Sequence, residues 1–189
     1  IFKMRYQIDN NMKIITPGAF SYLYTYIEIV KYAIRNKLNN LFIYDDDVAF
    51  HNNYNIDPEL IDKNEGIVSL GAMDYSWTKN IQTCVNKVYN CKGSSYGSHA
   101  LIINKKVFHK FLYVLEHKIL PVDCSPLHLF KYNFNSKIMY PNMAVQRIFK
   151  STINSSQVQY DIQNDSELSL QKYGWNMEEY FLPEIKTIL

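Results

Sequence analysis

The feature that most constrains this chain is an apolar run, Leu41-Phe42-Ile43-Tyr44, that leads directly into three acids, Asp45-Asp46-Asp47. Four apolar residues are too few for a helix, and they predict a buried strand with the acids at its carboxyl end. Unit charges about 6 Å apart repel by roughly 0.7 kcal/mol in water and by roughly 3 kcal/mol at an effective dielectric of about 20. A divalent cation would turn this repulsion into a set of ligands, because carboxylate oxygens suit Mg²⁺ and Mn²⁺.

Segments of helical and strand character alternate along the chain. Helical spacing or capping predicts helices over 19–38, 58–63, 105–117 and 125–134, and short apolar runs predict strands over 41–44, 67–71, 100–103 and 138–140. The polar stretch 74–98 is interpreted as a long functional loop. This alternation predicts an α/β fold with a mostly parallel sheet flanked by helices. We expect residues 1–150 to form the core and 151–189 a polar connector and a C-terminal tail that docks on it.

Composition narrows the functional classes. The formal charge is only +2 and no basic block is present, which argues against a nucleic-acid partner. The sequence contains no apolar stretch of about 20 residues, so we expect no transmembrane segment. Its three cysteines, Cys84, Cys91 and Cys124, lack CxxC spacing, which favours reduced thiols and a cytoplasmic location.

The acid triplet has two interpretations. In an extended chain, alternate side chains share a face, so Asp45 and Asp47 would point the same way and Asp46 the opposite way. That pair suits one hard cation bound to a diphosphate. The alternative is an acidic junction between a strand and a loop, because Asp favours turns. The triplet alone leaves both interpretations open.

Several stretches carry a resemblance to a known family. They are Thr16-Pro17-Gly18-Ala19 leading into Leu41–Val48, then Ile67-Val68-Ser69-Leu70-Gly71, Tyr96–Ile103, Pro121-Val122-Asp123, and Tyr140-Pro141-Asn142 with Gln146. In this order they resemble glycosyltransferase family 25, which includes lipooligosaccharide and collagen galactosyltransferases. The resemblance covers roughly residues 16 to 150.

The resemblance implies a GT-A-like fold and an inverting, metal-dependent hexosyltransferase. Such an enzyme moves galactose or glucose from a UDP-sugar to a hydroxyl of a glycan or a hydroxylated protein acceptor. Mn²⁺, or Mg²⁺, would join Asp47 and Asp45 to the diphosphate, and Asp46 would contribute to the donor site. Asp123 is the candidate general base on the acceptor, although it also fits a helix N-cap.

Two further residues are assigned to the donor side. Gly97 would permit close approach of the backbone, and His99 would contact phosphate or the donor sugar unless it is simply packed in the core. The chain also departs from the family, because Asp45 stands where a Glu is usual and the family's opening strand and helix are expected upstream of residue 1. Two other functions therefore stay open: a degenerate, non-catalytic glycan-binding or scaffolding module, and a metal-dependent phosphotransferase or nuclease.

Overall fold

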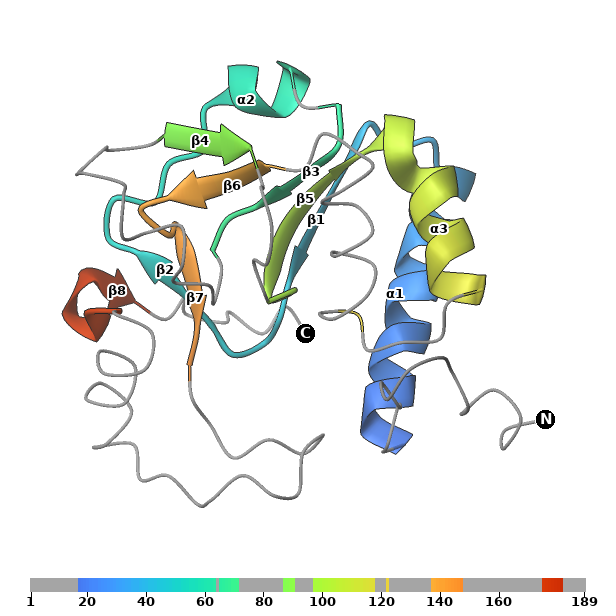
Figure 1. Cartoon of the computed structure of the whole chain (residues 1–189), viewed down its shortest axis with the longest axis horizontal. Coiled ribbons are helices and arrows are strands. Elements are labelled where there is room, and N and C mark those ends of the chain that lie inside the picture. The colour runs from blue at the N-terminus through green and yellow to red at the C-terminus, as the bar shows by residue number, and fades with distance from the viewer. Residues whose placement is uncertain are drawn as a thin grey trace, which may run out of the picture.

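The computed structural model describes residues 17–63, 65–71, 87–90, 97–117, 122, 137–147 and 175–181. These residues form three helices and eight strands (Figure 1). The helices are α1 (Pro17–Arg35), α2 (Pro58–Lys63) and α3 (Phe108–His117), with short 3₁₀ turns η3 (Lys105–Val107) and η4 (Met177–Glu179). The strands are β1 (Asn40–Tyr44), β2 (Val48–His51), β3 (Ile67–Ser69), β4 (Lys87–Asn90), β5 (Ala100–Asn104), β6 (Lys137–Tyr140), β7 (Ala144–Gln146) and β8 (Tyr180–Phe181).

In the described residues, the main sheet has five strands in the order β1-β5-β3-β6-β4. Among these strands only β3 and β6 pair in parallel, whereas the β1/β5, β3/β5 and β4/β6 pairs are antiparallel. The α/β class is therefore confirmed, but the prediction of a mostly parallel sheet is wrong. The physical reason is that β5 begins at the edge where β1 and β3 end, so it runs against both of its neighbours.

A second, three-stranded sheet has the order β7-β2-β8. Its strands pair antiparallel and were not predicted. β8 brings residues 175–181 against β2, and Trp175, only 3% exposed, packs with Ala49 and Val145. β4 lies within the stretch 74–98 that was interpreted as a loop, so that interpretation is wrong for residues 87–90.

The core lies on both faces of the main sheet. On one face α1 and α3 pack over side chains of β1, β3 and β5, and Figure 1 shows the two helices side by side. The spacing of the buried α1 side chains is that of an amphipathic helix: Leu23, Tyr26, Ile27, Val30 and Ala33. The opposite face packs against β2 and the segment around Leu60. None of the described helices is both long and apolar enough to cross a membrane.

β1 forms one edge of the main sheet. Leu41 and Ile43 face the helices, whereas Phe42 and Tyr44 on the other face are 42% and 36% exposed. The expectation of a strand buried on both faces is therefore wrong. An edge strand has a neighbour on one side only, and its outward side chains are covered less completely.

Candidate functional site

The acid triplet lies where several strands end. β1, β3 and β6 run in the same direction, so their carboxyl ends meet at the edge where β5 begins. The Asp45 amide donates to the His99 carbonyl at 2.8 Å, which fixes the start of the triplet to the start of β5. The amides of Met143 and Ala144 donate to the Leu70 carbonyl at 2.7 and 3.2 Å. Four separate segments of the chain therefore converge at this edge.

The triplet is a turn between β1 and β2. The Val48 amide donates to the Asp45 carbonyl at 3.3 Å, which closes a four-residue turn. The chain is therefore not extended here, and the expected alternation of Asp45 and Asp47 against Asp46 does not apply. Asp46 is exposed at the turn, while Asp45 and Asp47 are half-buried.

Asp45 is held by a hydroxyl from α1. The Tyr22 phenol lies 2.8 and 3.0 Å from the two carboxylate oxygens and donates to them, and it lies 3.0 Å from the Ser98 hydroxyl. Tyr26, one turn further along α1, donates to the Ser98 carbonyl at 2.8 Å. Burial is the largest cause that raises the pKa of Tyr22, followed by the neighbouring Tyr26 and Asp45, so the phenol stays protonated. This cluster ties α1 to the carboxyl end of β1.

Asp47 is held differently. The Gln146 side chain donates to Asp47 Oδ2 at 2.9 Å, and the Arg147 amide donates to the Asp47 carbonyl at 3.0 Å. The other carboxylate oxygen, Oδ1, is buried and has no hydrogen-bond partner among the described residues. Burial raises the pKa of Asp47, Gln146 works against that rise, and the charge of Asp46 adds to it. A buried acceptor without a partner costs about 1–3 kcal/mol, so this oxygen suits a cation.

His99 lies in the interior, with 1% exposure. Its Nε2 is 3.2 Å from the Ala144 carbonyl, a contact in which the ring donates, and the ring meets Trp175 edge to face. Burial lowers the pKa of His99 to about 4, although the bond to Ala144 works against that shift. The structure therefore places a neutral imidazole between β5 and β7, behind the acid triplet.

Two glycines, one by close packing and one by its backbone conformation, shape the surroundings of His99. A Cβ added at Gly71 would lie 1.7 Å from the Ala144 carbonyl oxygen and 3.1 Å from His99 Nε2, so only glycine fits. Gly97 has a φ of 107°, a conformation that favours glycine, and it leads into Ser98 and His99. Gly97 therefore shapes the entry to β5 beside Asp45.

The donor set is small. In the described parts of the chain, no group of three or more His, Cys, Asp or Glu side chains could hold a metal ion. Asp46 and Asp47 are adjacent, and the charge of Asp46 contributes to the raised pKa of Asp47. Two carboxylates fit a Mg²⁺ or Mn²⁺ ion that takes its remaining ligands from water and phosphate. Asp123, the candidate base, lies outside the described residues.

Comparison with known proteins does not assign the chain to a family. No protein-family model matches the chain, and no curated protein matches it significantly. Sequence reasoning singled out the acids, Gly97, His99 and Gln146 but missed Tyr22. A tyrosine on an amphipathic helix gives no sign of such a role, because its partner Asp45 is 23 positions away.

Proposed function

We propose that this protein is a metal-dependent glycosyltransferase of GT-A-like architecture that transfers galactose or glucose from a UDP-sugar, with inversion, to a hydroxyl of a glycan or a hydroxylated protein. The observation that carries the proposal is the buried Oδ1 of Asp47, which has no hydrogen-bond partner in the described parts of the chain and lies beside the exposed Asp46. Its place at the shared carboxyl edge of β1, β3 and β6 supports the proposal, since ligands gather at such edges in α/β sheets.

Each acid has a distinct role in the proposed site. Asp47, oriented by Gln146, is the principal metal ligand, and the exposed Asp46 is the second. Asp45 supports the turn through Tyr22 and need not touch the metal, which revises the expected pairing of Asp45 with Asp47. A divalent cation held there would offset the negative charge that develops on the departing UDP. Asp123 remains the proposed base that accepts a proton from the acceptor hydroxyl.

The buried residues behind the turn have a positioning role in this proposal. His99 joins β5 to β7 through its ring and holds the Asp45 amide through its carbonyl. Gln146, at the end of β7, holds Asp47. His99 therefore acts on the carboxylates through the strands and does not contact the donor.

The test is a turnover assay with Mn²⁺ and a panel of UDP-sugars. We expect release of UDP in the presence of an acceptor, and we expect Asp47→Ala to abolish it. The matched control is Glu65→Ala, since Glu65 is an exposed acid that pairs with Lys106 far from the triplet in sequence. If the folded protein neither binds UDP nor releases it from any donor, the proposal fails.

One observation favours a second candidate, a non-catalytic glycan-binding or scaffolding module. Both oxygens of Asp45 accept from Tyr22, so one of the two acids expected to hold the metal is already engaged. Calorimetry separates the candidates. Glycan binding that is independent of Mn²⁺ and UDP supports the module, whereas UDP binding that requires Mn²⁺ supports the transferase.

A further inference from the structure

The outer edge of β1 can form backbone hydrogen bonds with another strand. Backbone hydrogen bonds join Asp45 to His99 and Lys105 to Asn39 across the β1/β5 pair. Because hydrogen-bonded positions alternate in an antiparallel pair, the backbone groups of Asn40, Phe42 and Tyr44 point away from β5. No described strand pairs with that side of β1.

The sequence of β1 itself lacks the usual protection against pairing. Natural edge strands carry charged residues, prolines or bulges that keep other strands away. β1 reads Asn-Leu-Phe-Ile-Tyr and has none of these, and Phe42 at its centre is 42% exposed. An uncharged edge with an exposed aromatic at its centre is a pairing surface.

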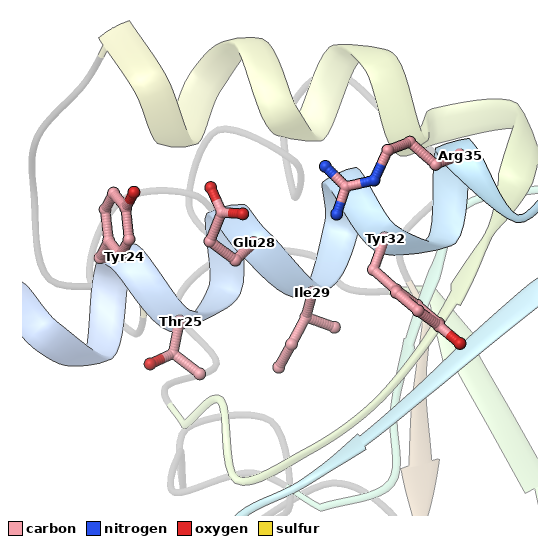
Figure 2. Close-up of a pocket in the computed structure, with 6 residues that line it drawn as sticks. All are labelled: Tyr24, Thr25, Glu28, Ile29, Tyr32 and Arg35. Carbon is pink, nitrogen blue, oxygen red and sulfur yellow. The ribbon is translucent and has the colours of Figure 1, made fainter.

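The neighbouring helix has an exposed aromatic face. A shallow groove of about 460 Å³ runs along α1, and Figure 2 shows the side chains that line it. Tyr24 and Tyr32 in this groove are 55% and 56% exposed. Glu28 and Arg35 lie two turns apart along the same face. Glu28 has an exposed ion pair with Lys31 at 3.5 Å, whereas Arg35 makes no ion pair with any described residue. The groove residues are Tyr24, Thr25, Glu28, Ile29, Tyr32 and Arg35.

We propose that a second copy of this chain covers this surface, with β1 pairing antiparallel to β1 about a two-fold axis at Phe42. The strand is self-complementary in that register. Phe42 lies opposite Phe42 of the second copy, and Asn40 opposite Tyr44, so all three outward-pointing residues form hydrogen-bonded pairs. The result is one continuous sheet of ten described strands, twice the five described strands of the main sheet in one copy.

The charges on α1 fit the same two-fold axis. An antiparallel copy of α1 brings Glu28 against Arg35 of the second copy, and the midpoint between these residues lies beside Tyr32. That midpoint is about 5 Å from Arg35 along the helix. Phe42 lies about 7 Å into β1 from Asn40. Because residues 36–39 connect the end of α1 to the start of β1, we infer that both centres lie at a similar depth.

Charge at the ends of β1 favours the same register. In the metal-free protein, antiparallel pairing brings the carboxyl end of one β1, with exposed Asp46, toward the amino end of the other, which follows exposed Lys37. Opposite charges therefore meet at both ends of the paired strands. The formal charge of +2 adds little repulsion between copies.

Light scattering across a concentration series tests the pairing, and it does not depend on transferase activity. We expect a monomer–dimer equilibrium between about 1 µM and 1 mM. Phe42→Lys places like charges directly opposite each other and should weaken dimerisation at least about tenfold. The control is Tyr113→Lys, since Tyr113 is a 62% exposed tyrosine on α3. Circular dichroism and thermal unfolding show whether each variant folds.

A charge swap provides a second, milder test. Arg35→Glu should weaken the dimer about two- to fivefold, and adding Glu28→Arg should restore it. Hydrogen exchange at the Phe42 amide should slow as concentration rises. A protein that stays monomeric overturns the proposal. Slow exchange in that monomer would mean that another segment of the chain covers β1, and fast exchange would mean an open edge. A dimer insensitive to Phe42→Lys also overturns it.

Discussion

The Tyr22 phenol is expected to contribute measurably to stability through Asp45. Tyr22→Phe removes one hydroxyl and keeps the ring, which packs 5.1 Å from the ring of Tyr26. The lost hydroxyl lies 2.8 and 3.0 Å from the carboxylate oxygens of Asp45 and 3.0 Å from Ser98 Oγ. A hydrogen bond to a charged group contributes about 1.5–3 kcal/mol. The site is only half-buried, so we expect a loss of about 2 kcal/mol.

The assay is urea unfolding at pH 7 with a thermal scan in parallel. For a chain of this size, about 2 kcal/mol lowers Tm by about 4–8 °C. The control is Tyr24→Phe on the same helix, where the side chain is 55% exposed, and it should change stability by less than about 0.5 kcal/mol. A double-mutant cycle with Asp45→Asn should give a coupling energy of at least about 1 kcal/mol. Equal losses for Tyr22→Phe and Tyr24→Phe, or strict additivity with Asp45→Asn, would refute the assigned contact.

Three further predictions concern the same edge of the sheet. Gly71→Ala should cost about 3 kcal/mol or more in urea unfolding, because its Cβ would lie 1.7 Å from a backbone carbonyl oxygen. His99 titrates near 6.5 when unfolded and at about 4 when folded, so acidification through that window should cost roughly 3 kcal/mol. His99→Gln, which retains a donor for Ala144, should lack that part of the pH dependence. Asp47→Asn should raise the Tm of metal-free protein at neutral pH, because burial raises the pKa of Asp47 and so penalises its charge. That gain should vanish as pH falls below the ordinary value of 3.8, where the wild-type carboxyl is protonated too.

Local patterns were sufficient for α1 and for several strands of the main sheet. The 3.6-residue spacing of Leu23, Ile27 and Val30 predicted α1, and the apolar runs predicted β1, β3 and β5 within one or two residues. Strand direction could not be predicted in the same way. A short strand has the same sequence pattern in either direction, and only its neighbours decide the pairing. The edge position of β1 was missed for the same reason.

The candidate site was predictable only in part. The Asp triplet was visible because three adjacent charges after an apolar run are unusual. The geometry of the triplet could not be predicted, because side chains alternate between faces only in an extended chain. Here the Val48 amide closes a turn on the Asp45 carbonyl. The roles of Tyr22 and Gln146 depend on contacts across 23 and 99 positions of sequence, which no local pattern encodes.

The central claim is that Asp47 helps to hold a cation that binds a nucleotide diphosphate. Calorimetric titration of UDP into the folded protein, with and without Mn²⁺, tests this claim most directly. We predict UDP binding that requires Mn²⁺ in the wild type and is lost in Asp47→Asn, while Asp47→Asn remains folded. UDP binding that is equal with and without Mn²⁺, or unchanged in Asp47→Asn, would contradict the claim.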